Sequence, residues 1–182
     1  MGLEFKMLCP DHGVLWRDPA RIIDAYARWS RQDALKQKAI VVYDTMWYST
    51  HKMALAIADG LHAEGIDVRP MKIREYDRSD IMTEVLDAKA VVVGSPTLNN
   101  GIFPTVADFL TYMKGLRPKE KIGAAFGSYG WSGEAVKLIN TELEAMKFDI
   151  VDPGLKIQYV PDQSGLEAGF QLGEKIGKAI AG

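Results

Sequence analysis

From Lys38 onward, short apolar runs alternate with stretches of helical periodicity, and this alternation is the feature that most restricts the fold. Five runs have the length and composition of strands, and the segments between them carry apolar residues at helical spacing. Strands joined by helices form parallel sheets with right-handed crossovers, so the sequence predicts an α/β fold with a doubly wound, five-stranded parallel sheet. The predicted strands are residues 39–43, 66–71, 90–93, 122–126 and 155–160.

The composition of each predicted strand indicates its place in the sheet. The first, third and fourth strands are apolar throughout, which is typical of strands buried on both faces. The second and fifth alternate apolar and polar residues, and Pro70 in the second also favours an edge position. The order 2-1-3-4-5 places both alternating strands at the margins. In that order, ligands bind beyond the carboxyl ends of strands one and three.

Residues 1–37 precede this alternation and predict an N-terminal helical extension. Asp18 followed by Pro19 is typical of an N-cap and the first helical position. Residues 31–38 are polar and are interpreted as a linker. The expected apolar stripe of the helix consists of Ile22, Ile23, Tyr26 and Trp29.

Composition gives no reason to expect a nucleic-acid or membrane partner. The formal net charge is −2, no apolar run reaches membrane-spanning length, and we find no signal peptide. A single cysteine, Cys9, excludes an internal disulfide and a cysteine-based metal cluster, so we expect a cytoplasmic protein.

Three loops are predicted to meet at the carboxyl edge of the sheet. The first, residues 44–50, carries the hydroxyls of Thr45, Ser49 and Thr50 but no lysine, directly before a helix. A helix N-terminus has unpaired N–H groups and a positive dipole end, so this loop can hold an anion. Neither common nucleotide-loop motif is present. The loop predicts a phosphate monoester that is bound rather than cleaved, although an ordinary Ser/Thr N-cap would have the same composition.

The second and third loops, residues 95–101 and 127–133, are rich in glycine, asparagine and serine, which lets backbone amides approach a ligand closely. Tyr129 and Trp131 in the third loop can stack on a planar ring. Each loop alone could be an ordinary turn. Together, the three loops predict a ligand with a flat heteroaromatic ring and a polar tail ending in phosphate, which is FMN.

These segments resemble those of flavodiiron proteins, the A-type flavoproteins that reduce oxygen or nitric oxide. Residues 43–53 resemble the phosphate loop of flavodoxin-like domains, and residues 94–100 and 126–135 resemble the two flavin-ring loops. Residues 9–17, Cys-Pro-Asp-His-Gly-Val-Leu-Trp-Arg, are similar to the segment that joins the metallo-β-lactamase-like diiron domain to the flavodoxin domain. The resemblance runs from about Met7 to the end. It implies the C-terminal flavodoxin-like domain of the rubredoxin:oxygen and nitric oxide oxidoreductase family.

This resemblance also implies the domain organisation and the cofactor-binding residues. Residues 1–37 would be the remnant of the joining segment, and residues 38–182 a flavodoxin-like FMN-binding domain. The resemblance assigns the FMN phosphate to Thr45, Met46, Trp47, Ser49 and Thr50. It assigns the pyrimidine end of the ring to Pro96, Thr97, Asn99 and Asn100, and its other side to Ser128, Tyr129, Gly130, Trp131 and Gly133.

Tyr48 departs from the family pattern, which commonly has glycine at this position. A Cβ atom restricts positive φ, so we expect a slightly different turn and a reduced affinity for FMN.

The sequence does not predict a metal site or a catalytic residue in this chain. His12 matches the final iron ligand of the family, but the other ligands belong to a domain that this sequence does not include. The chain has three histidines, too few for a diiron site, and we expect His51 and His62 to be solvated.

The predicted function is therefore an FMN-binding electron-transfer domain, the redox module of an oxidoreductase rather than a complete enzyme. The resemblance implies rubredoxin as electron donor, the diiron domain of the parent protein as acceptor, oxygen or nitric oxide as final substrate, and a homodimer. Three alternatives remain open at this point: a flavodoxin-like NAD(P)H:quinone reductase, a free-standing flavodoxin, and a scaffold that binds no flavin.

Overall fold

The computed structural model describes residues 5–182, apart from the side chains of residues 35 and 36. The chain forms two compact units, one up to Asp33 and one from Ala34 onward. None of the helices in the described part of the chain has the length and apolar character needed to cross a lipid bilayer.

The N-terminal unit contains helix α1 (Pro19–Arg31). As predicted, Asp18 caps the helix, because its carboxylate accepts a hydrogen bond of 3.2 Å from the N–H of Ala20. The predicted apolar stripe is only partly correct. Ile22 is buried, whereas Ile23 and Tyr26 are exposed. Cys9 in the preceding segment is exposed as well.

The second unit is built on a parallel sheet with the order β2-β1-β3-β6, followed by two short strands in the fifth position. Its strands are β1 (Leu35–Tyr43), β2 (Asp67–Lys72), β3 (Ala88–Gly94), β6 (Ile122–Tyr129), β7 (Asp149–Ile150) and β8 (Leu155–Gln158). β7 pairs with the start of β6 and β8 with its end. The predicted order 2-1-3-4-5 is therefore confirmed, with a fifth strand divided in two.

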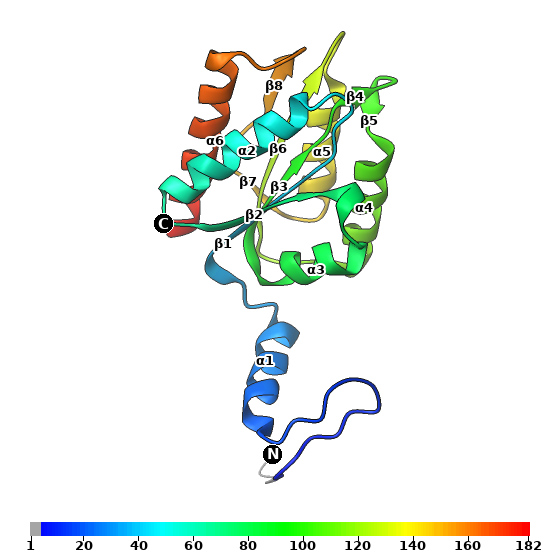
Figure 1. Ribbon diagram of the computed structural model, residues 1–182, viewed down its shortest axis with the longest axis vertical. Coiled ribbons are helices and arrows are strands. Elements are labelled where there is room, and N and C mark those ends of the chain that lie inside the picture. Colours follow the sequence, from blue (N-terminus) through cyan, green and yellow to red (C-terminus); the bar gives the residue numbers. More distant parts are fainter. Residues whose placement is uncertain (1–4) are drawn as a thin grey trace. The chain divides into compact units, whose positions relative to one another are not determined.

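Helices cover both faces of this sheet (Figure 1). One face packs against α2 (Ser49–Ala63) and α6 (Gln163–Ala181), and Ala39, Val41 and Tyr43 of β1 point into this core. The other face packs against α3 (Arg78–Asp87), α4 (Pro104–Leu116) and α5 (Glu134–Ala145), and receives Ile40 and Val42. This alternation follows from the opposite orientation of successive side chains in a strand. It places the apolar central strands between two cores, as predicted.

Three local features differ from the prediction. β1 begins at Leu35, inside the segment interpreted as a linker. The second loop contains an antiparallel hairpin of β4 (Thr97–Leu98) and β5 (Gly101–Ile102). The fifth strand is interrupted by a turn in which the Asp152 carboxylate accepts a hydrogen bond of 2.8 Å from Gly154, a residue with a φ of 102°. Pro153 within this turn has no N–H to donate, which favours the break.

Candidate functional site

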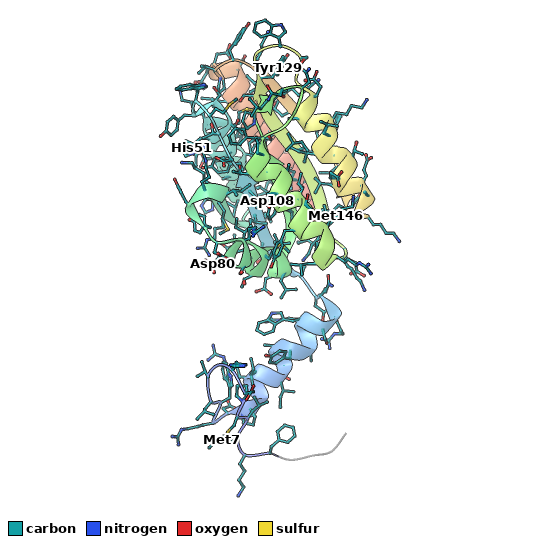
Figure 2. The ribbon with its side chains drawn as sticks, turned by 90° about the vertical axis from the view of Figure 1, so that its right-hand side faces the viewer. Met7, His51, Asp80, Asp108, Tyr129 and Met146 are labelled. Atoms are coloured by element: carbon teal, nitrogen blue, oxygen red, sulfur yellow. The ribbon has the colours of Figure 1, made fainter. Side chains whose placement is uncertain are left out.

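An open groove of about 270 Å³ lies at the carboxyl edge of the sheet. Figure 2 shows Tyr129, one of its lining residues, at the end of the unit opposite Asp80. Three of the segments that line it are the three predicted loops, which confirms that these loops converge. The lining residues are Met46, Trp47, Ser49, Pro96, Thr97, Ser128, Tyr129, Gly130, Tyr159 and Val160.

The first loop presents neutral hydroxyls at the start of α2. Thr45 has an exposed fraction of 3%, and within the described chain its Oγ1 atom has no hydrogen-bond partner. Ser49 and Thr50 are the first two residues of α2 and are buried. The Thr50 hydroxyl shares a hydrogen bond of 2.9 Å with that of Ser128, which connects the first loop to the end of β6. Since a buried hydroxyl without a partner is costly, Thr45 is suited to a ligand that accepts its hydrogen bond.

Tyr48 adopts the conformation that was expected to be unfavourable for it. Its φ and ψ angles are 64° and 0°, at the N-cap of α2. The expectation of a different turn is therefore wrong: Tyr48 adopts the left-handed conformation despite its Cβ atom, at a cost in backbone strain. The Tyr48 ring packs edge-on against His51, with ring centroids 6.0 Å apart, and lies 6.0 Å from the Lys72 ammonium.

Sequence reasoning missed the ionic contacts behind the first loop. Asp44 is completely buried and pairs with Arg74, whose Nε donates a hydrogen bond of 2.9 Å to Oδ1. Thr105 donates one of 2.6 Å to Oδ2. A carboxylate directly after an apolar strand was the available signal, since a buried charge requires a partner.

His51 was expected to be solvated, and this expectation is wrong. It is half-buried, and its Nδ1 shares a hydrogen bond of 2.6 Å with the hydroxyl of Tyr43. Burial raises the pKa of Tyr43 to about 12, with further contributions from the negative charges of Glu75 and Asp44. The phenol therefore remains neutral at physiological pH and can donate to the imidazole. His62, by contrast, is exposed.

The second loop contributes Pro96 and Thr97 to the groove. Ser95 is buried at the base of this loop, where its hydroxyl accepts a hydrogen bond of 2.9 Å from the N–H of Phe103. Asn99 and Asn100 form the turn of the β4–β5 hairpin, with φ angles of 49° and 57°, and are not among the lining residues. Asparagine is favoured in this turn because it tolerates the left-handed conformation.

The third loop contributes Ser128, Tyr129 and Gly130. Gly133 is the N-cap of α5 with a φ of 73°, and a Cβ atom there would lie 3.0 Å from the Tyr129 ring. The absence of a side chain at Gly133 thus leaves room for the Tyr129 ring. Trp131 is not among the lining residues, and its exposed fraction is 93%.

Tyr159 and Val160 line the groove but were not among the predicted site residues. They follow β8, which ends at Gln158 rather than Val160. The N–H of Tyr159 donates a hydrogen bond of 2.7 Å to the carbonyl of Tyr129, which holds the two segments together. The sequence signal was an aromatic residue at the carboxyl end of an edge strand.

The donor set of the groove fits FMN. Uncharged hydroxyls and the first N–H groups of α2 suit a phosphate that is held without reaction. Trp47 lines the groove and has an exposed fraction of 85%, so its ring is free to stack on a flat ring system. No group of three or more His, Cys, Asp or Glu side chains within the described residues is arranged to bind a metal.

Comparison with known proteins agrees with this architecture. Residues 41–173 match the flavodoxin family. The nitric oxide reductase of Moorella thermoacetica is 49% identical over 183 residues, which cover 100% of this chain and 46% of that protein. This chain therefore spans about half the length of such relatives.

Two solved structures give the same picture. The rubredoxin oxygen:oxidoreductase from Desulfovibrio gigas superimposes with a TM-score of 0.90 at 41% identity, covering 97% of this chain and 44% of that one. A flavodoxin from the domain Archaea superimposes with a TM-score of 0.74 at 34% identity, covering 80% of this chain and 99% of that one.

Proposed function

Because this chain belongs to the flavodoxin family, we propose that it binds FMN in the groove at the carboxyl edge of its sheet and transfers electrons between a protein donor and a diiron site. It is a flavodoxin-like domain of the flavodiiron type, and its family implies FMN as the cofactor. The main support for the proposed site is that all three loops line one groove and that the buried Thr45 hydroxyl beside it has no hydrogen-bond partner within the described chain.

The residues of the first loop would hold the phosphate. The hydroxyls of Thr45, Ser49 and Thr50 and the first N–H groups of α2 are all neutral donors. A neutral site binds a phosphate dianion without offering it a proton or a metal. Retention without hydrolysis is what a cofactor site requires.

The second and third loops would hold the ring. Pro96 and Thr97 of the second loop line the groove together with Tyr129, Gly130 and Tyr159. FMN supplies the chemistry when bound, because its ring accepts and donates one or two electrons. The loop residues would shield the bound ring from water where they line the groove. We include Asn99, Asn100, Trp131 and Gly133 in the proposed site as its rim and support.

The partners follow from the relatives. A rubredoxin oxygen:oxidoreductase and a nitric oxide reductase match this chain, so we propose rubredoxin as the donor and a diiron centre outside this chain as the acceptor, with oxygen or nitric oxide reduced there. A cytoplasmic location and a homodimer are parts of the same proposal.

Titration of the purified protein with FMN tests the proposed site. We expect quenching of FMN fluorescence with one equivalent bound. Thr45→Val keeps the shape but removes the unpaired hydroxyl, so it should weaken FMN binding about tenfold, which corresponds to one hydrogen bond to a charged group. Thr111→Val is the matched control, because Thr111 is exposed and its hydroxyl donates a hydrogen bond to the carbonyl of Ala107 within α4.

Electron transfer is tested by mixing the FMN-loaded protein with reduced rubredoxin or with NADH and a quinone. Rapid reduction of the flavin by rubredoxin supports the proposal. Rapid quinone turnover with NADH would instead identify a quinone reductase, and a protein that takes up no FMN would refute the site.

A further inference from the structure

Next to the first loop lies an ionic cluster in which the buried carboxylate of Asp44 contacts Arg74 and Thr105. Asp44 directly follows β1, Arg74 belongs to the short 3₁₀ helix η1 (Ile73–Glu75), and Thr105 lies in the first turn of α4. Both carboxylate oxygens of Asp44 accept hydrogen bonds, Oδ1 from Arg74 and Oδ2 from Thr105. The cluster therefore connects the first loop to two other elements, η1 and α4.

The same cluster fixes the backbone of Thr45 at both polar atoms. The Thr45 N–H donates a hydrogen bond of 2.7 Å to Asp44 Oδ1, and Arg74 Nη2 donates one of 2.5 Å to the Thr45 carbonyl oxygen. With both backbone groups engaged, the remaining polar atom of Thr45 is its hydroxyl. That atom is the buried one without a partner within the described chain.

The cluster also controls the charge next to the proposed phosphate position. Asp44 is a neighbour of Thr45 and completely buried, so as an unpaired anion it would repel a phosphate dianion through a low-dielectric medium. Arg74 pairs with Asp44 at 2.9 Å and neutralises it. The Arg74 guanidinium is half-exposed and lies over the Phe103 ring at 5.6 Å, which limits its orientation.

We propose that Asp44, Arg74 and Thr105 are positioning residues for the FMN phosphate: they set the orientation of the Thr45 hydroxyl and cancel the negative charge beside it. This inference rests on the proposed function. The three loops contain no Lys or Arg, and Arg74, which lies outside all three, supplies a positive charge near the proposed phosphate position.

Binding of FMN and of riboflavin, which lacks the phosphate, tests the inference. Arg74→Met removes the cation and leaves Asp44 unpaired. We expect the FMN dissociation constant to rise about tenfold or more, as for a nearby like charge, while that of riboflavin changes less than about threefold. In the double variant Asp44→Asn with Arg74→Met, no charge remains but the Arg74 bond to the Thr45 carbonyl is still lost, so FMN binding should recover to a value between those of Arg74→Met and the wild type.

Arg78→Met is the matched control, because Arg78 also pairs with a carboxylate, Asp108, and lies over an aromatic ring, that of Tyr112. It should leave both dissociation constants unchanged. Circular dichroism verifies folding. If Arg74→Met does not fold, Arg74→Lys replaces it: lysine keeps the charge, so the ratio of riboflavin to FMN dissociation constants should stay near the wild-type value.

The outcomes distinguish failure of the proposed function from failure of this inference alone. A wild-type protein that binds no FMN overturns the proposed function and this inference with it. A wild-type protein that binds FMN, with an Arg74→Met variant that binds FMN equally well or loses riboflavin to the same extent, overturns this inference alone. A Lys variant that loses FMN selectivity tenfold overturns the argument from charge.

Discussion

At the scale of single residues, Lys121 is the buried charge with the clearest consequence for stability. It is almost completely buried directly before β6, where its Nζ donates hydrogen bonds of 2.8 and 2.7 Å to the carbonyls of Leu86 and Ala88. Burial lowers the pKa of the Lys121 ammonium to about 8, although the nearby Asp87 carboxylate opposes this shift. The folded protein therefore binds the Lys121 proton less tightly than the unfolded chain does.

Lys121 should consequently contribute a rise in stability with pH through the window from about 8 to 10.5, because its side chain binds more protons in the unfolded state there. Lys121→Met removes this dependence. The free energy of unfolding of the variant, relative to the wild type, should decrease by about 3 kcal/mol between pH 7.5 and 10.5. Urea unfolding at several pH values measures it, with exposed Lys137→Met as the control for loss of a charge. A parallel pH dependence in wild type and Lys121→Met would contradict the prediction.

Tyr48 gives a second prediction at this scale. Its positive φ is disfavoured for any residue with a Cβ atom. Tyr48→Ala and Tyr48→Gly both remove the ring and its contacts, and they differ in the Cβ atom. We expect the Gly variant to be more stable than the Ala variant by about 1 kcal/mol in urea unfolding. Equal stabilities would show that the left-handed conformation is not retained.

At the scale of elements, the contact between α2 and α6 depends on glycine. α6 has glycine at every fourth position from Gly165 to Gly177, which places these residues on one side of the helix. A Cβ atom on Gly173 would lie 2.2 Å from the carbonyl oxygen of Ile57, and one on Gly60 would lie 2.0 Å from that of Phe170. The two helix backbones therefore approach more closely than a Cβ atom at these positions would permit. This contact holds α2 against α6, and the first residues of α2 belong to the first loop.

Gly173→Ala should destabilise the protein by about 2 kcal/mol or more, because overpacking exceeds the gain in helix propensity. Gly115→Ala is the matched control. Gly115 also lies in a helix, α4, but a Cβ atom there meets nothing within 4 Å. It should stabilise by about 0.5 kcal/mol. Thermal unfolding measures both, and equal melting temperatures for the two variants would refute the packing argument.

At the scale of the whole molecule, binding of FMN should be coupled to folding. The groove is assembled from residues at or beyond the carboxyl ends of β1, β3, β6 and β8, so the unfolded chain cannot reproduce it. A ligand that binds the folded state alone stabilises it by about 2.7 kcal/mol when present at a hundred times its dissociation constant.

For a chain of this size, that free energy corresponds to a rise in melting temperature of about 5 to 10 °C. Calorimetric scans with and without FMN measure the rise. Riboflavin at the same multiple of its own dissociation constant should give a similar increase, since the coupling depends on occupancy. Unfolding that is insensitive to FMN would indicate that the cofactor also binds the unfolded chain or does not bind.

Much of the fold could be predicted because its signals are local. Hydrophobic periodicity predicts the central strands and the helices around them, and Asp18 with Pro19 predicts the start of α1. The difference between apolar and alternating strands was sufficient to predict the sheet order. The loops of the groove could be predicted too, because the carboxyl ends of parallel strands lie at one edge.

Other features were decided by tertiary structure alone. The pairing of Arg74 with Asp44 spans 30 residues, and the hydrogen bond between Thr50 and Ser128 spans 78. Tyr159 enters the groove because β8 ends two residues earlier than its pattern predicts. The sequence by itself determined which segments become strands, helices and binding loops, since periodicity and capping act over a few residues. Only the tertiary structure decided which distant side chains meet, because that depends on which strands become neighbours and where each one ends.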